Sequence, residues 1–405
     1  MKMRGSSKAR VIFFLALIGM VALVVVLRLR GRTPALISPV APGAGVPAAR
    51  QLAARQHEKR AMATQDDGAA AQICGFGKVA IDQEDANAAR ERVGELTKET
   101  AARWLTALQN SGDLRARAAG LLLDGKVTGG EPIHPATEQT RDAVVQLAAG
   151  TAEPAVYAVA LSMCGAYSES GPDRACQQIS LQRWAQIDPN NAVPWLLLAD
   201  DARRRHDVAG EANAFAQAAS ASKVDAYGDS LYAFAAPELP PDVTPLERDY
   251  FATEVIGVEA AMATPHYGIA SRHCSVDAMR DSKLRQQCNS LAELMISQGS
   301  DLLDLSVGKV IGIRAGWSSE RVNDLAQRQD ALAEVITELI PSDAGEWTCE
   351  TVSRFNTYMD QRARVGEVAA ANDLLERSGG TAPQLAEKYR AHLDDIRRHA
   401  TQQDQ

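Results

Sequence analysis

Aromatic residues are scarce in this chain: Phe, Trp and Tyr together make up 5 % of its 405 residues. Apolar residues nevertheless reach 46 % and charged residues 23 %. This composition excludes a disordered chain, a collagen-like chain and a protein with many membrane spans. The abundant alanine favours helices, and the length allows two or three ordinary domains or one long helical array.

Signatures of catalysis are also missing, because the sequence contains no HExxH, no paired CxxC and no G-x-S-x-G. Ser306 and Lys309 have the SxxK spacing of serine acyltransferases, but the motifs that accompany it are absent. The glycine-rich segment at 75–78 lacks the spacing of a phosphate-binding loop, and a turn after Cys74 explains it better. We therefore expect no catalytic residue and no cofactor.

His266, His273 and Cys274 are the nearest approach to a set of metal ligands. They lack the close ligand pairs that zinc sites use, so ordinary surface or core histidines are the better interpretation and we expect no metal. Acidic pairs such as Asp200 and Asp201 are adjacent in sequence. Neighbours on a helix point in different directions, so these pairs indicate a solvated face.

Negative charge is absent from the first 32 residues, which carry seven of the 43 Lys and Arg and none of the 51 Asp and Glu. The net charge of -8 therefore hides an acidic body with 36 basic and 51 acidic residues. Nucleic acid binding needs clustered basic residues that displace counterions from phosphates. The acidic body has no such stripe, so we expect no nucleic acid partner.

One long hydrophobic run is present, from Val11 to Leu27, and basic residues flank it on both sides. Its 17 uncharged residues span about 26 Å as a helix, which suffices when the flanking arginine stems reach the interface. We interpret the run as a single transmembrane helix that serves as a signal anchor. The alternative is a cleaved signal peptide, which usually ends in small residues, whereas this run is followed by Arg28.

Charge alone leaves the orientation open, because both flanks are basic. Only ten residues precede the helix, and a long C-terminal body can be translocated regardless of charge. We therefore predict a cytoplasmic tail at 1–10, a transmembrane helix at 11–27 in a bacterial inner membrane, and a body in the periplasm.

All six cysteines lie beyond this helix, and their even number suits an oxidising compartment. The candidates for disulfide bonds are Cys74, Cys164, Cys176, Cys274, Cys288 and Cys349. We predict two local bridges, the first between Cys164 and Cys176 on facing helices of one hairpin. The second joins Cys274 to Cys288 and needs a helix break at Asp281 and Ser282, with Ser282 as the cap. Cys74 and Cys349 would then link the ends of the body, one of fifteen possible connectivities.

The segment after the helix, 33–72, is rich in Pro and Ala and is predicted to be a linker. The folded body begins near Cys74. Beyond it, apolar residues recur every three to four positions, as at Ala101, Trp104, Leu105 and Leu108, which indicates helices. Breaks are predicted at 129–135, 168–173, 188–191, 237–245, 341–345 and 378–383. The apolar stretch 302–317 contains three charges and is predicted to be a buried helix.

One part of the body has a 34-residue period. After the turn at 188–191, Trp195, Leu198, Ala199, Ala202, Phe215 and Ala218 follow at the spacing of a paired-helix repeat. A step of 34 residues back from Trp195 and Ala199 reaches Leu161 and Gly165, and Pro189 closes that earlier unit. The segment 154–225 therefore resembles the tetratricopeptide repeat. In that family the concave face binds a peptide or protein, and the resemblance implies such a partner for this chain.

The predicted fold is therefore an all-α array of helical hairpins, similar to tetratricopeptide repeats, with flanking helices and one N-terminal transmembrane helix. Its body divides into an N-terminal helical region at 73–153, the repeat-like hairpins at 154–225 and a C-terminal helical region at 226–405. Flanking helices are needed because two repeats alone do not make a stable solenoid.

Three aromatic residues near the 188–191 turn are candidates for a binding groove, although packing in the core is the competing interpretation: Tyr157, Trp184 and Trp195. We predict a membrane-anchored periplasmic module that binds or scaffolds a protein or peptide. Two alternatives stay open. One is an envelope enzyme that uses residues around 266–274 or 346–350, and the other is a structural anchor for another membrane complex.

Overall fold

A computed structural model describes residues 70–80, 86–124, 138–164, 174–262, 264–339 and 347–403. The predicted tail at 1–10, the predicted transmembrane helix at 11–27 and all but the last three residues of the predicted linker at 33–72 lie outside them. Among the described residues, none of the helices combines the length and the apolarity that a bilayer crossing requires.

The chain separates into two compact units. The smaller unit runs to Val93 and includes 343–348, and the larger unit comprises 94–342 and 349–405. The predicted domain limits at 73, 154 and 226 stay predictions.

The smaller unit contains an antiparallel hairpin of β1 (Ala70–Ile73) and β2 (Gly77–Ala80). Gly75 and Gly77 have positive φ values of 80° and 74° at the turn, a conformation that glycine adopts without steric cost. The predicted turn after Cys74 is confirmed. The hairpin itself corrects the sequence analysis, in which residues 70–72 are linker, because strands of four residues are too short to show an alternating pattern.

Apart from this hairpin, every regular element in the described ranges is helical, so the predicted all-α class is confirmed. The first helices are α3 (Ala86–Asn110), α4 (Leu114–Leu123), α5 (Glu138–Ala149), α6 (Pro154–Met163), α7 (Leu181–Ile187), α8 (Ala192–Arg204), α9 (Val208–Ala219) and α10 (Leu231–Ala235). The chain continues with α11 (Pro245–Ala261), α12 (Pro265–His273), α13 (Ser282–Gln298), α14 (Leu302–Ala315), α15 (Ser319–Thr337), α16 (Cys349–Val365), α17 (Glu367–Arg377) and α18 (Ala382–Gln403). Three short 3-10 turns intervene: η1 (Ala175–Gln178), η2 (Ala236–Glu238) and η3 (Ala278–Arg280).

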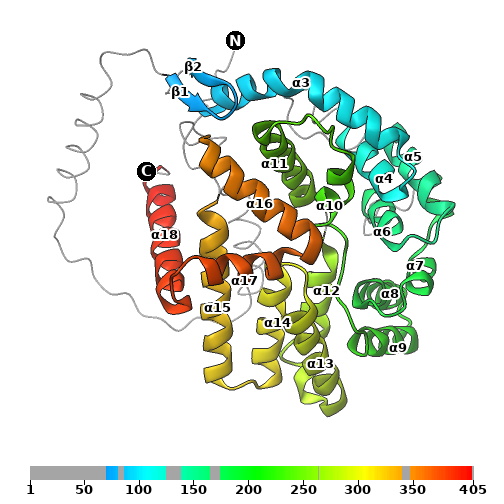
Figure 1. Ribbon diagram of the computed structural model, residues 1–405. Helices are drawn as coiled ribbons and strands as arrows, with labels where there is room; N and C mark the ends of the chain where they lie inside the picture. Colours follow the sequence, from blue (N-terminus) through cyan, green and yellow to red (C-terminus); the bar gives the residue numbers. More distant parts are fainter. Residues whose placement is uncertain are drawn as a thin grey trace, which may run out of the picture. The chain divides into compact units, whose positions relative to one another are not determined.

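Helix pairs organise the larger unit. Neighbours in sequence pack as hairpins, most extensively α8 with α9 and α13 with α14, whereas α18 returns to pack along α15 (Figure 1). The predicted break at 188–191 lies between α7 and α8, as expected. The predicted break at 237–245 overlaps η2 and the first residue of α11, and that at 378–383 overlaps the first two residues of α18. The predicted breaks at 129–135, 168–173 and 341–345 lie outside the described residues. Residues 302–315 of the apolar stretch form helix α14, which confirms the predicted helix. Its burial is partial, because Leu305, Val307 and Ile311 are buried whereas Ile313 is 50 % exposed.

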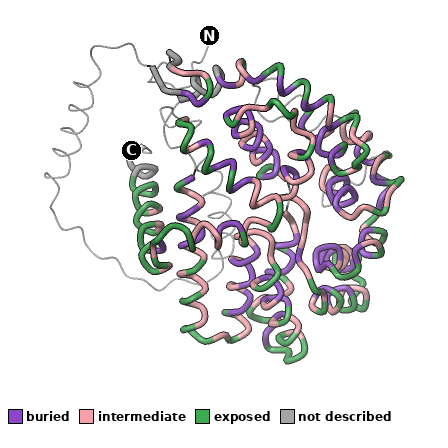
Figure 2. Tube along the Cα trace, in the orientation of Figure 1, coloured by how far each residue is buried: buried purple, intermediate pink, exposed green. Residues whose placement is uncertain are grey.

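The core of the larger unit follows the apolar periodicity of the sequence. Ala101, Trp104, Leu105 and Leu108 on α3 are all at most 5 % exposed, and Figure 2 shows buried residues along the packed faces of the helices. The Trp104 ring stacks on Phe251 of α11 with centroids 5.0 Å apart. Its indole N–H donates to the carbonyl of residue 235 at 3.0 Å, so this buried tryptophan also satisfies its polar group.

Two disulfides lie within the larger unit, between Cys164 and Cys176 and between Cys274 and Cys288. Both local pairings are confirmed, with Cα atoms 5.7 and 5.6 Å apart. Cys74 and Cys349 are also disulfide-bonded, and none of the six cysteines is a free thiol, all six being described residues. The pairing of these two cysteines with each other stays a prediction.

The structure corrects two details of these bridges. Cys164 follows the last residue of α6 and Cys176 lies in η1, so the first bridge does not join two facing α-helices as predicted. The predicted break before α13 is present, but Asp281 is the cap and Ser282 is the first helical residue. The Asp281 carboxylate accepts from two backbone N–H groups at 2.8 and 3.0 Å, which a serine hydroxyl one residue later does not do.

Candidate functional site

The three predicted groove residues occupy different environments. Tyr157 and Trp184 are each 2 % exposed, and the Tyr157 hydroxyl accepts a hydrogen bond from the backbone N–H of Ser180 at 3.0 Å. Trp195 is partly exposed, and its indole N–H donates to the carbonyl of Pro189 at 2.9 Å. The burial of Tyr157 and Trp184 matches the competing interpretation of core packing, so of the three only Trp195 presents surface.

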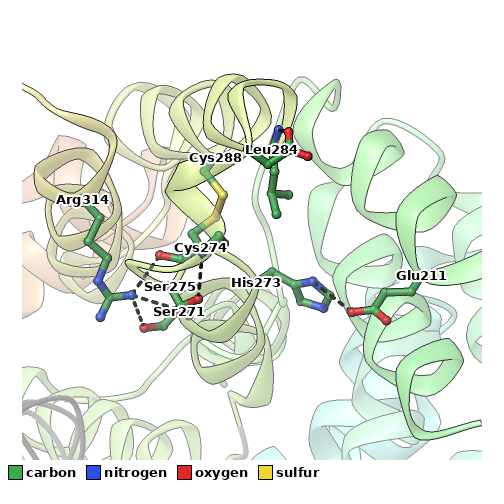
Figure 3. The surroundings of a disulfide bond; sticks show 10 residues. Glu211, Ser271, His273, Cys274, Ser275, Leu284, Cys288 and Arg314 are labelled. Atoms are coloured by element: carbon green, nitrogen blue, oxygen red, sulfur yellow. Dashed lines mark hydrogen bonds and ion pairs between the residues drawn. A yellow bond between two sulfur atoms is a disulfide. The ribbon is translucent and has the colours of Figure 1, made fainter. Parts of the chain in front are cut away.

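Two histidines lie near the second disulfide in the sequence, and Figure 3 shows the ring of one of them, His273, pointing toward Glu211. His266 is 2 % exposed, and burial lowers its pKa to about 3. His273 stacks on Phe215 with centroids 4.9 Å apart, and its Nδ1 lies 3.5 Å from Glu211. Burial lowers the pKa of His273 to about 4. Both imidazoles are therefore neutral at pH 7, and Cys274 is committed to its disulfide.

The other motifs that resemble catalytic ones serve structural roles. The Ser306 hydroxyl donates to the carbonyl of Leu302 at 3.0 Å, and the Lys309 ammonium donates to Gln329 at 2.7 Å. This lysine is therefore held by a neighbouring helix. Glu350 is exposed at the start of α16, and residue 346 lies outside the described residues.

A pocket of about 300 Å³ with a mixed polar and apolar lining lies in the larger unit. Its walls come from the start of α4, the loop between α9 and α10, α10 itself and the end of α16. The lining residues are Asp113, Arg115, Asp225, Tyr227, Ser230, Ala233, Phe234, Pro237 and Ala363. This volume lies at the lower end of the range for ligand pockets and suits one side chain or a small molecule.

The loop that carries Asp225 is held by a network of hydrogen bonds. Asn191 caps α8 and exchanges hydrogen bonds with Asp225, accepting from its backbone N–H at 3.1 Å and donating to its carbonyl at 2.6 Å. The Tyr227 hydroxyl donates to Asp188 at 2.9 Å and accepts from Lys223 at 2.7 Å. Lys223 also forms an ion pair with Asp188 at 3.0 Å. The loop is therefore anchored to the turn between α7 and α8.

The backbone of this loop is strained at Tyr227, which has a φ of 57°. A bulky residue with positive φ is costly and persists only where its surroundings impose it. One carboxylate oxygen of Asp225 accepts from the Tyr227 backbone N–H at 2.7 Å. The hydrogen bonds of the Tyr227 hydroxyl hold the other end of the residue, so the network fixes both Tyr227 and Asp225 at the wall of the pocket.

Charge is distributed unevenly around the pocket. Burial, reinforced by Asp229, raises the pKa of Asp225 to about 7. Asp113 and Arg115 form a bidentate ion pair across 2.8 and 3.2 Å, and the hydrogen bond from Arg115 lowers the pKa of Asp113. The Arg115 guanidinium also lies over the Phe234 ring, 5.9 Å from its centroid. The lining thus has two carboxylates, one already paired cation and two aromatic rings.

A set of buried carboxylates lies in the same unit, and Arg362, next to the pocket residue Ala363, pairs with one of them. Arg362 donates to Glu259 at 2.8 Å, and their side chains are only 10 % and 5 % exposed. Burial raises the pKa of Glu259 although Arg362 opposes the rise. Burial also raises the pKa values of Asp301, Asp304 and Glu367. Within the described ranges, no three His, Cys, Asp or Glu side chains are arranged to hold a metal ion.

Sequence reasoning missed this pocket because its lining comes from positions that span 113 to 363 in the chain. One signal was available: Asn191 and Asp225, which hydrogen bond to each other, are 34 residues apart, the predicted repeat length. Under the predicted 34-residue period, the polar turn that begins at Lys223 would be the counterpart of the turn at 188–191. Comparisons of this chain with protein-family models, with curated proteins and with solved structures find no match.

Proposed function

We propose that this chain is a membrane-anchored module, held in the bacterial inner membrane by its N-terminal helix, whose helical body binds a protein or peptide in the periplasm. The pocket at Asp225 is the observation that carries the proposal. It is formed by three stretches far apart in the sequence, at 113–115, 225–237 and 363, and a hydrogen-bonded loop with a strained residue holds part of its lining in position. Binding sites are built in this way when geometry must be maintained before the partner arrives.

The proposed arrangement of the centre is a pair of tetratricopeptide-like hairpins. The α8 and α9 pair supports it, since Ala199, Ala202, Phe215 and Ala218 are all at most 3 % exposed between packed helices. Small residues are needed where two helices approach closely, and a ring fills the space between layers. The hydrogen bonds between Asn191 and Asp225, one period apart, also fit stacked repeats. The earlier unit departs from the pattern, because its second helix is divided into η1 and the short α7.

The proposed compartment rests on the disulfides. Disulfides persist in the bacterial periplasm and other oxidising compartments and are rare in the cytosol, where thiols are kept reduced. Cys274 and Cys288 are both fully buried, and their bridge closes a segment that contains a 3-10 turn and a helix start. A body that depends on such bridges needs an oxidising compartment to fold, which supports export beyond the membrane.

Photo-crosslinking in intact cells tests the proposed function. A crosslinking amino acid replaces Ala363 at the wall of the pocket, and a matched variant carries it at Ala391, an exposed alanine of α18. We expect a crosslinked periplasmic protein or peptide, identified by mass spectrometry, from position 363 and not from position 391. Equal products from both positions, or none from position 363 in cells that contain the chain, would contradict binding at this pocket.

A further inference from the structure

The Asp225 carboxylate is the group in the pocket with spare bonding capacity. One of its oxygens accepts from the Tyr227 backbone N–H, and its second oxygen makes no hydrogen bond to any described residue. A carboxylate can accept several hydrogen bonds and prefers charged donors. The nearby cation Lys223 is already held by Asp188 and the Tyr227 hydroxyl, so it does not neutralise Asp225 fully.

The apolar part of the lining also suits a positively charged group. The Phe234 ring already interacts with one guanidinium, that of Arg115, which shows that a planar cation fits against this wall. Lys223 lies 5.1 Å from the centroid of the Tyr227 ring in the same way. Aromatic faces attract cations through the ring quadrupole, and they accept the methylene stem of a long side chain as well.

An anion is the less suitable ligand for the same pocket. The only basic residue in the lining is Arg115, and its guanidinium already donates two hydrogen bonds to the Asp113 carboxylate. An incoming anion would have to displace that carboxylate and would face Asp225 as well. The charges therefore select against anions and leave an acidic, aromatic pocket of about 300 Å³.

We propose that this pocket binds an organic cation, the ammonium or guanidinium group of a Lys or Arg side chain, with Asp225 as its counter-ion and Phe234 against its stem. This inference rests on the proposed function for the source of the cation, a protein or peptide. A free amine would offer the same chemistry, and the experiment separates the two sources.

Binding of such a cation depends on pH in one direction. The groups that face Asp225 are Asp229 and Lys223 of its own loop, Asp188 at the end of α7, and the Asp113 and Arg115 pair of α4. Burial raises the pKa of Asp225 to about 7 in the empty pocket. Protonation removes the counter-ion, so affinity for a cation is greatest above pH 7 and declines as the pH falls below it.

The test is a ligand-observed NMR titration of the purified full-length chain at pH 8 and pH 6. The probes are the N-acetyl methylamides of arginine, lysine and norleucine, and free butylamine. The main variant is Asp225→Asn, because an asparagine oxygen still accepts from the Tyr227 backbone N–H and preserves the turn. Asp281→Asn is the matched control, since it makes the same change at a helix cap away from the pocket, and asparagine caps as well as aspartate. Phe234→Leu removes the aromatic wall and keeps apolar volume.

We expect the arginine or lysine probe to bind at pH 8 and to bind more weakly at pH 6. In Asp225→Asn its affinity should fall about tenfold or more, because the substitution removes one charge-assisted contact. Phe234→Leu weakens binding too, whereas Asp281→Asn does not, and norleucine does not bind. Failure of both cationic probes to bind at pH 8, equal binding of norleucine, or unchanged affinity in Asp225→Asn overturns the inference.

The crosslinking result separates this inference from the proposed function. Charge-dependent binding of the probes and of butylamine, without any crosslinked protein or peptide at position 363, upholds the cation site and refutes a macromolecular partner. A position-specific crosslinked partner whose yield is unchanged in Asp225→Asn upholds the proposed function and refutes the role of the cation.

Discussion

Removal of the buried cation Arg362 is the sharpest test of the electrostatic account of the larger unit. Its guanidinium donates to Glu259 at 2.8 Å, and the other oxygen of Glu259 accepts from the Tyr232 backbone N–H at 3.0 Å. Burial alone would lower the pKa of Arg362, but Glu259 and Glu367 raise it above its ordinary value. The substitution Arg362→Met retains most of the apolar stem and removes the charge.

The expected cost follows from the burial of the pair. Both side chains are at most 10 % exposed, so Arg362→Met leaves the Glu259 carboxyl in the interior without its partner, where it is either an unpaired charge or must take up a proton at pH 8. Loss of one member of a buried ion pair costs about 3 to 5 kcal/mol. The exposed pair of Arg398 with Asp395 is the control, because Arg398→Met should cost no more than about 1 kcal/mol. Urea denaturation of the purified chain at pH 8, followed by circular dichroism, measures both values.

Two further results refine this prediction. The double variant Arg362→Met, Glu259→Gln should recover most of the lost stability, because a neutral amide still accepts from Tyr232 and no buried charge remains. Without Arg362 the pKa of Glu259 rises further, so its protonation offsets the loss at low pH and the cost is smaller at pH 6 than at pH 8. A cost below about 1 kcal/mol at pH 8, or an equal cost at both pH values, would refute the reasoning.

Two other predictions concern the disulfide and the pH dependence. Replacing Cys274 and Cys288 by alanine opens a loop with a sequence separation of 14, which should lower the free energy of unfolding by about 3 kcal/mol, and a loss under about 1 kcal/mol in urea denaturation would contradict the bracing role. Burial raises the pKa of Asp249 and of Asp225 to about 7, so their contribution to stability is present at low pH and is lost as the pH rises through 7. Burial lowers the pKa values of His266 and His273, so these histidines reduce the stability as the pH falls below about 6.5. They are fewer than the buried carboxyls. The urea midpoint should therefore be higher at pH 6 than at pH 8, and the reverse order would show that the carboxyls are not desolvated as described.

Local patterns predicted the helical elements and the local disulfides well. Apolar spacing of three to four residues identified the buried face of α3. The charged residues within 302–317 distinguished α14 from a membrane-spanning helix. The Cys274 and Cys288 bridge was predictable because a helix break between them brings the cysteines together. These features depend on residues within about one or two helices of each other, which is the range over which periodicity and capping act.

Very short elements, the exact capping residue of a helix, and features that depend on residues far apart in the chain could not be predicted. The β1 and β2 hairpin has too few residues for an alternating pattern, and the cap at Asp281 depends on which of two adjacent polar residues leaves the helix. Asp113, Asp225 and Ala363 line the same pocket because of how the helices pack, and no motif in the sequence indicates that packing. The raised pKa of Asp225 likewise arises from burial by distant segments, and sequence alone carries no measure of burial.

Thiol labelling tests the central claim, an exported and disulfide-braced body, most directly. Intact cells and the purified full-length chain are treated with an alkylating reagent with and without prior reduction, and modified cysteines are counted by mass spectrometry. The account predicts that all six cysteines stay unmodified until a reductant is added, and that reductant and reagent reach them without lysis. Free thiols that become reachable only after lysis would place the body in the cytoplasm and contradict the account.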